Sequence, residues 1–156
     1  MQVELAPEIK RRFRTALRKA GSVEIGGMLF AEQLAPSNFK VIDFSFDRDS
    51  GSHSAFQRRP QSHQKALDEF FKRTGNNFQR FNYLGEWHSH PSFPALPSCE
   101  DIRTMSDIVE DPRSAITFAV LLVVRLRLRL WLEHSFTLFA RGQVARQVRY
   151  TSQSRS

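Results

Sequence analysis

The sequence predicts an α/β (α+β) protein in which a central sheet is flanked by about three helices. Two observations lead to this expectation: segments of helical periodicity alternate with segments of strand character, and turn residues separate them. The chain has 156 residues, of which 40% are hydrophobic and 25% charged. This composition is ordinary for a globular protein, and the length suits one core that folds alone. We expect one domain over residues 1–150 and a short disordered tail over residues 151–156.

Three segments repeat apolar residues at the spacing of a helix. The first is Pro7–Ala20, where Pro7 suits a first turn and Gly21 suits a stop. The second covers residues 62–75 and the third covers residues 98–111. Each segment has apolar residues on one face only, so we expect three amphipathic helices that pack against the sheet.

Seven segments have strand character. They cover residues 23–31, 38–46, 78–90, 115–124, 125–134, 135–140 and 143–150. A turn over residues 32–38 separates the first two, and a polar loop over residues 47–60 precedes the second helix. The strict alternation of "RLRLRLWLEH", residues 125–134, predicts a single strand with one apolar face.

The charge balance and the apolar runs exclude several classes of protein. The chain carries 23 Lys and Arg against 16 Asp and Glu, a net charge of +7. Such a surface favours an acidic partner, but the basic residues are spread and form no compact motif with interleaved aromatics, so we expect no nucleic-acid partner. The longest apolar run, "AITFAVLLVV", is shorter than the about 20 residues of a membrane-spanning helix. The N-terminus has no apolar signal core, and we expect no membrane partner.

Cysteine usage indicates the compartment. Cys99 is the single cysteine, so no intrachain disulfide can form. A chain without disulfides fits a reducing environment, and we expect a cytoplasmic location.

The segment "GEWHSHPSFPALPSCED", Gly85–Asp101, gathers the residues that carry chemistry. His88 and His90 are two apart on a predicted strand, so their imidazoles share a face and can bind one metal ion. Ser98 opens the third helix with Asp101 three residues on, a capping-box pattern in which the helix dipole keeps the carboxylate ionised. A folded-back loop would bring Asp101 to the two imidazoles. Three protein ligands leave a fourth zinc position for water, the pattern of a catalytic site.

A simpler explanation exists for the same residues. Paired histidines can be surface residues, and Ser-x-x-Asp commonly begins a helix without any metal. The other histidines, His53, His63 and His134, have no neighbouring ligand at metal spacing, and we expect no role for them. A basic binding module with incidental histidines is therefore an alternative.

The spacing His-x-His-Pro, six residues, Ser, two residues, Asp resembles the JAMM motif of the MPN-domain metalloproteases, and every fixed position is occupied. That family also carries a glutamate on an early strand after the first helix, and "SVEIGGMLF" supplies Glu24 there. The resemblance covers nearly the whole chain. It implies the MPN (cytidine-deaminase-like) fold with a central, mostly antiparallel sheet. Within the family, "YLGEWHSHP" is most similar to small bacterial members that remove ubiquitin-like conjugates, as in CBASS antiphage operons.

The resemblance implies a zinc-dependent isopeptidase or peptidase that hydrolyses the amide after the C-terminus of a ubiquitin-like modifier. His88, His90 and Asp101 would hold Zn²⁺, Glu24 would act as general base and then acid, and Ser98 would donate to the oxyanion. The implied partners are the modifier or its conjugate, with its tail extended in a groove beside the zinc, and the activating and conjugating enzymes of the same operon. A non-catalytic MPN scaffold is an alternative, although such members typically lack the ligands.

Two further residues have competing roles. Glu86 lies two residues before His88, so it shares the ligand face and is an alternative general base or a partner that holds a histidine. Glu24 is preferred because only its position matches the glutamate of the family. Cys99 beside Ser98 suggests a thiol nucleophile, but such a thiol needs a poised base. We expect Cys99 to be a small buried or half-buried filler instead.

Overall fold

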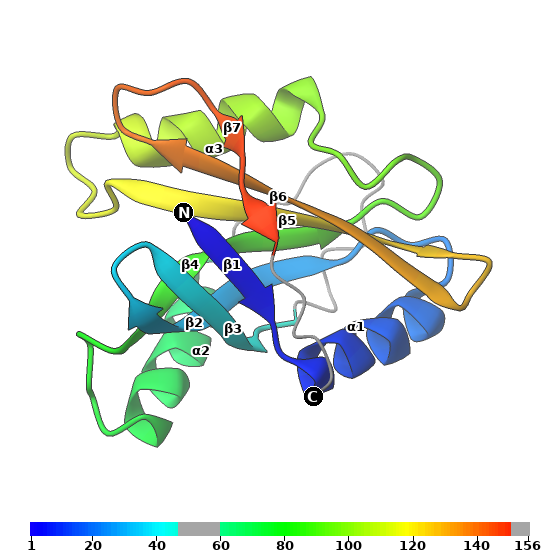
Figure 1. Cartoon of the computed structure of the whole chain (residues 1–156), viewed down its shortest axis with the longest axis horizontal. Coiled ribbons are helices and arrows are strands. Elements are labelled where there is room, and N and C mark those ends of the chain that lie inside the picture. The colour runs from blue at the N-terminus through cyan, green and yellow to red at the C-terminus, as the bar shows by residue number, and fades with distance from the viewer. Residues whose placement is uncertain (47–59, 151–156) are drawn as a thin grey trace.

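The structure is a computed structural model that describes residues 1–46 and 60–150. Within these residues it contains three helices and one mixed sheet of eight strands (Figure 1). In chain order the elements are β1 (Gln2–Leu5), α1 (Pro7–Ala20), β2 (Gly26–Ala35), β3 (Asn38–Phe44), α2 (Pro60–Arg73), β4 (Phe81–Ser89), α3 (Cys99–Glu110), β5 (Phe118–Arg127), β6 (Trp131–Ala140), β7 (Arg146–Gln147) and β8 (Arg149–Tyr150).

The sheet has the strand order β7-β6-β5-β4-β2-β3-β1-β8. Its long neighbours β2–β3, β2–β4 and β5–β6 pair antiparallel. The central pair β4–β5 and the pairs that β1 makes with β3 and β8 are parallel. This mostly antiparallel sheet with its three helices confirms the predicted α/β (α+β) class and has the arrangement expected for the MPN fold.

Helix α1 covers one face of the sheet. Its buried residues Ile9, Phe13 and Leu17 lie at helical spacing and pack into the main hydrophobic cluster. At the centre of this face lies the fully buried Trp87 of β4, whose ring meets that of Phe13 edge-on at 4.8 Å between centroids. The indole N–H also donates to the Ser45 carbonyl at 2.9 Å. We call this side of the sheet the α1 face.

Helices α2 and α3 lie on the opposite face, which we call the α2/α3 face (Figure 1). Met105 and Val109 of α3 pack against those residues of β5 that alternate with the ones facing α1. Side chains of β4 alternate in the same way, so the residues on either side of Trp87 point away from the α1 face. Among the described residues, no helix combines the length and apolar character that crossing a membrane requires.

Two glycines permit the close approach of chain segments beside β4. A Cβ on Gly85 would lie 1.9 Å from the Val120 carbonyl oxygen of β5, where pairing between the two strands begins. A Cβ on Gly27 of β2 would lie 2.1 Å from the Ser45 carbonyl oxygen. A backbone oxygen cannot yield to either contact, so both positions require glycine.

The predicted single strand over residues 125–134 is wrong. Strand β5 ends at Arg127, a turn covers residues 128–130, and β6 begins at Trp131. The alternation survives because Leu126 pairs with Leu132 across the hairpin, so both strands keep their leucines on one face. Leu128 and Arg129 have φ values of 49° and 58°. A side chain in this left-handed region costs about 1–2 kcal/mol per residue, and so turn preferences did not reveal the hairpin.

Other boundaries also differ from the expectation. Strand β1 was not predicted, since four residues offer too short a pattern. Strand β2 extends to Ala35 through most of the expected turn, and the segment 143–150 contains two strands of two residues each instead of one. The three helices are confirmed, with Ser98 as the N-cap of α3. The predicted loop over residues 47–60 lies outside the described residues except for Pro60, which begins α2; the predicted tail over residues 151–156 and His53 also lie outside them.

Candidate metal centre

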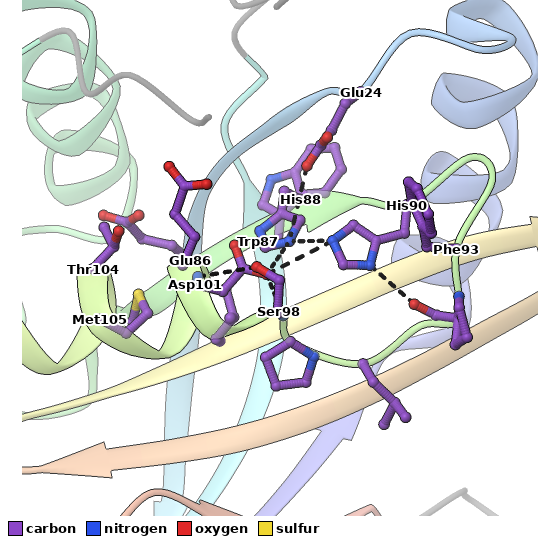
Figure 2. A pocket seen from close by; sticks show the side chains of 15 residues that line it. Glu24, Glu86, Trp87, His88, His90, Phe93, Ser98, Asp101, Thr104 and Met105 are labelled. Carbon is purple, nitrogen blue, oxygen red and sulfur yellow. Dashed lines mark hydrogen bonds and ion pairs between the residues drawn. The ribbon is translucent and has the colours of Figure 1, made fainter. Parts of the chain in front are cut away.

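Strand β4 and the residue that follows it supply two histidines to one point on the α2/α3 face. Their Nε2 atoms are 3.0 Å apart, and the side chains of His88 and His90 are both buried (Figure 2). Pairing with β2 on one side and β5 on the other fixes this part of the strand.

His90 is oriented by the loop that follows the strand. Its Nδ1 lies 2.9 Å from the Pro94 carbonyl oxygen, which can only accept, so Nδ1 carries the proton. In the neutral ring this leaves the lone pair on Nε2, which points at His88. A backbone carbonyl on the far nitrogen is the usual support of a metal-bound histidine. Residue types in the sequence could not reveal this contact, because any residue can supply a carbonyl.

Asp101 enters from the first turn of α3. The Ser98 backbone N–H and hydroxyl both lie 2.7 Å from its Oδ2, and the Asp101 N–H donates back to Ser98 Oγ at 3.1 Å. Oδ2 lies 3.3 Å from His88 Nε2 and 3.7 Å from His90 Nε2. Burial alone would raise the pKa of Asp101, but hydrogen bonds with His88 and Ser98 outweigh it and lower the pKa to about 2. The carboxylate is therefore anionic at neutral pH.

These three side chains fit a zinc ion. Zinc–ligand bonds of about 2.0–2.1 Å at tetrahedral angles place ligand atoms about 3.3 Å from one another. The two histidine nitrogens and Asp101 Oδ2 are separated by 3.0, 3.3 and 3.7 Å. Two imidazole nitrogens and one carboxylate oxygen also form a donor set that suits zinc.

Glu24 lies beside the same imidazoles and precedes β2 instead of standing on it. Its Oε1 is 4.0 Å from His88 Nε2, and Glu24, His88 and His90 each offer a ligand atom within 4.8 Å of the others. Both carboxylates are thus candidates for the third ligand. Asp101 fits better, because its contacts with both histidines are close to the tetrahedral spacing. Figure 2 shows the Glu24 carboxylate directed at the two rings from the side opposite Asp101.

The environment of Glu24 changes its proton affinity. Burial raises the pKa of Glu24, and the two histidines oppose this rise only in part. A carboxyl group whose pKa is raised is better suited to take up and release a proton near neutral pH than an exposed one.

Ser89 holds the backbone next to Glu24. The Ser89 N–H donates to the Ile25 carbonyl at 2.8 Å, and Ser89 Oγ accepts from the Ile25 N–H at 3.0 Å. Ser89 is 1% exposed and lies between the two histidines, with its side chain on the other side of the strand. Sequence reasoning missed this residue, because the middle position of His-Ser-His carries no chemical signal of its own.

The Ser98 hydroxyl has a single proton. In this structure the hydroxyl donates that proton to Asp101 Oδ2, with 2.7 Å between the two oxygens. The hydroxyl oxygen also accepts from the Asp101 N–H, so the expected capping box is present. Donation to a substrate oxygen would require this proton to turn away from the carboxylate.

The remaining candidates are placed as follows. Glu86 is 3% exposed and, with both histidines, lines a cavity of about 530 Å³. The expected burial of Cys99 is wrong: it is exposed, because it is the first residue of α3, and it is not part of this lining. His134 packs against Tyr150 with 4.4 Å between ring centroids and takes no part in the cluster. Nothing is described of the His63 side chain.

The fold and the clustered side chains define a domain of the JAB/MPN class. Residues 7–137 match the family described as prokaryotic homologs of the JAB domain (Prok-JAB), and the chain belongs to this family.

Two solved structures are similar to this one. One is the solution structure of protein DSY2949 from Desulfitobacterium hafniense, with 18% identity, a TM-score of 0.71 and coverage of 98% of this chain and 94% of that one. The other is the solution structure of a protein from Salinibacter ruber, with 18% identity, a TM-score of 0.55 and coverage of 94% and 90%. Likenesses at this identity show the fold alone. No curated protein matches the chain.

Proposed function

We propose that this chain is a zinc-dependent isopeptidase or peptidase that hydrolyses the amide bond after the C-terminal residue of a ubiquitin-like modifier. The observation that carries the proposal is the spacing of the His88, His90 and Asp101 ligand atoms at 3.0–3.7 Å, with the Glu24 carboxylate next to them. Membership of the JAB family supports the hydrolase class.

His88, His90 and Asp101 would hold the zinc ion. Bound there, zinc would supply Lewis-acid polarisation of a water molecule and of the scissile carbonyl. In the neutral ring the Pro94 carbonyl places the His90 proton on Nδ1 and leaves the Nε2 lone pair directed at the site, while hydrogen bonds with His88 and Ser98 keep Asp101 ionised.

Glu24 would handle the protons of the reaction. Its carboxylate takes one proton from the attacking water, whose oxygen forms a bond to the carbonyl carbon. The C–N bond then breaks, and Glu24 returns the proton to the leaving amine, so the products are a free carboxylate terminus and a free amine. Ser98 would donate to the oxyanion in the tetrahedral intermediate, where one donor typically contributes about 10²–10³ in rate.

The loop over residues 91–97 would guide the substrate tail. Phe93 and Leu96 are exposed to 69% and 49%, and both line the cavity that contains the histidines. Exposed apolar walls beside a polar centre suit an extended peptide that enters with its terminal bond at the metal. The partner would therefore be the modifier or its conjugate.

The resemblance of "YLGEWHSHP" to small bacterial deconjugating enzymes supports a place in an antiphage system of the CBASS type. In that setting the enzyme would reverse the work of activating and conjugating enzymes encoded beside it, in the cytoplasm. The check is genetic: flanking genes should encode an activating enzyme, and Glu24→Ala should change phage resistance of cells that carry the whole operon.

The enzymatic proposal is tested with a purified conjugate of a ubiquitin-like modifier. We expect one zinc per chain by elemental analysis, and mass spectrometry should show a free modifier with an intact C-terminal carboxylate. Chelation and His88→Ala should stop cleavage and remove zinc, whereas His134→Ala should keep both, because His134 lies outside the cluster. Thiol alkylation should not inhibit. Cleavage that survives complete zinc removal, or an acyl adduct on Cys99 or Ser98, would refute the mechanism.

A further inference from the structure

The turn between β5 and β6 carries large apolar side chains into solvent. We call residues 127–131 the hairpin tip. Its Leu128, Leu130 and Trp131 are exposed to 75%, 62% and 66%. Figure 1 shows the hairpin projecting beyond the end of α1, at the edge of the molecule. Core formation does not explain these side chains, because none of them belongs to a hydrophobic cluster.

The backbone of the hairpin tip is strained, and two hydrogen bonds hold it in this conformation. Leu128 and Arg129 both have positive φ, where glycine or asparagine would be relaxed. The Leu130 N–H donates to the Arg127 carbonyl at 3.0 Å, and Arg18 Nε of α1 donates to the Arg129 carbonyl at 3.1 Å. Strain that surrounding contacts maintain is typical of functional segments. Here a leucine, and not a small residue, occupies a strained position at the apex.

Arginines surround the apolar apex. Arg125, Arg127 and Arg129 belong to the hairpin, and Arg18 joins them from α1. Arg127 contacts Glu133 at 3.5 Å, whereas Arg125 and Arg129 have no acidic partner among residues 1–46 and 60–150. The tip is therefore apolar at its apex and positively charged at its base, which is complementary to an anionic surface with an apolar interior.

We propose that the hairpin tip binds the surface of an anionic lipid bilayer. Stable protein interfaces bury about 800 Å² per partner over a complementary surface, and three side chains on a narrow turn offer much less. A bilayer needs no complementary shape: leucine and tryptophan enter the headgroup boundary, while arginine binds lipid phosphates. This proposal departs from the absence of a membrane partner that composition led us to expect, and it does not depend on the proposed enzymatic function.

The two tryptophans make the test specific. Trp87 is fully buried and Trp131 is 66% exposed, so a blue shift of emission on binding reports Trp131. Vesicles of 70% phosphatidylcholine and 30% phosphatidylserine should sediment the protein and shift its emission. Pure phosphatidylcholine vesicles should bind at least about 10-fold more weakly, and added salt should weaken binding to the anionic vesicles.

Variants separate the tip from the overall charge. The double variant Leu128→Asn and Leu130→Ser should bind anionic vesicles at least 10-fold more weakly and stay folded, because asparagine tolerates the left-handed region. Val144→Ser is the matched control: Val144 is 90% exposed at another turn, and its loss should change nothing. The proposal is overturned if anionic vesicles do not bind the wild-type protein, or bind the double variant equally well. It is also overturned if the double variant binds anionic vesicles normally and is weakened only in its binding to a purified acidic protein.

Discussion

Glu24 and Asp101 are two carboxylates beside one pair of imidazoles, and their surroundings move their pKa values in opposite directions. Burial raises the pKa of Glu24, while hydrogen bonds from His88 and Ser98 overcome burial and lower the pKa of Asp101 to about 2. One carboxylate is thus a permanent anion, suited to hold a cation, and the other can exchange a proton. Carboxylates separated in this way commonly divide ligand and acid–base roles.

If Glu24 is the general base, its substitution should lower kcat without changing the zinc content. Glu24→Gln should lower kcat by about 10³-fold or more, because one residue serves both proton transfers, while the zinc content stays near one per chain. Glu86→Gln is the matched control and should lower kcat less than about 10-fold. Kinetics on a modifier conjugate with zinc analysis decide the point, and the reverse pattern would assign the base to Glu86.

Ser98 has two separable roles. It caps α3 and holds Asp101, and both contacts are present in the structure. If it also donates to the oxyanion, Ser98→Ala at saturating zinc should lose about 10² in kcat and about 1 kcal/mol of stability. Ser98→Thr, which keeps a hydroxyl, should recover most of both. A loss of zinc affinity with kcat unchanged would limit Ser98 to positioning Asp101.

At the scale of elements, β4 is the part on which the site depends. Its pairing with the parallel strand β5 begins at Gly85, three residues before His88. A Cβ on Gly85 would lie 1.9 Å from the Val120 carbonyl oxygen, so the two strands can meet there only around a glycine.

Gly85→Ala should therefore cost about 3 kcal/mol in stability and also weaken zinc binding, because separating the strands moves His88. Gly142→Ala is the control: its φ is 69°, but a Cβ there meets nothing within 4 Å. It should cost only about 1 kcal/mol, with unchanged zinc affinity. Urea denaturation and zinc titration measure both quantities. Equal zinc affinity in folded Gly85→Ala protein would contradict the prediction.

Asp43 joins β3 to two helices. It accepts hydrogen bonds from Arg12 of α1 and Arg73 of α2. Burial opposes its ionisation, but these hydrogen bonds outweigh burial, and the pKa of Asp43 lies below its ordinary value. A carboxylate with a lowered pKa stabilises the fold above the ordinary carboxyl pKa of about 4, and this contribution is lost as the pH falls through the lowered pKa.

Asp43→Asn should accordingly cost about 1 kcal/mol at pH 7, since both arginines are largely solvated, and much less at pH 3. Urea denaturation at the two pH values is the measurement. Glu133→Gln, which loses one exposed contact at 3.5 Å, should have no measurable effect at either pH. A cost for Asp43→Asn that is the same at both pH values would mean that charge plays no part.

Periodicity in the sequence predicted the three helices because each has one apolar face against the sheet. It failed at residues 125–134, because leucines stay on one face whether the strand continues or folds back. The spacing of the histidines, Ser98 and Asp101 predicted a cluster that the structure does bring together. Ser89 and the Pro94 carbonyl could not be predicted, because their role depends on backbone position and not on residue type.

At the scale of the whole molecule, the candidate centre joins three distant parts of the chain. Glu24 precedes β2, His88 lies on β4 with His90 just after its end, and Asp101 lies in the first turn of α3. These segments are adjacent only in the folded state, so an ion that binds all of them stabilises that state over the unfolded one.

Zinc at about 100 times its dissociation constant should stabilise the protein by about 2.7 kcal/mol. For a chain of this size this raises Tm by roughly 5–11 °C. Differential scanning fluorimetry with and without zinc measures the shift. His88→Ala should abolish the shift and His134→Ala should keep it, whatever each variant does to Tm without metal. An equal shift in His88→Ala would place the bound zinc elsewhere.

The position of Trp87 directly before His88 has a consequence for how such chains diverge. The indole packs on the α1 face, while the imidazoles point to the other side and belong to no hydrophobic cluster. Selection for a stable core and selection for reactivity therefore act on alternate residues of one strand. A lineage can replace both imidazoles and keep its fold, because the apolar packing under them is untouched. Loss of chemistry with retention of shape is thus an easy evolutionary route for this architecture.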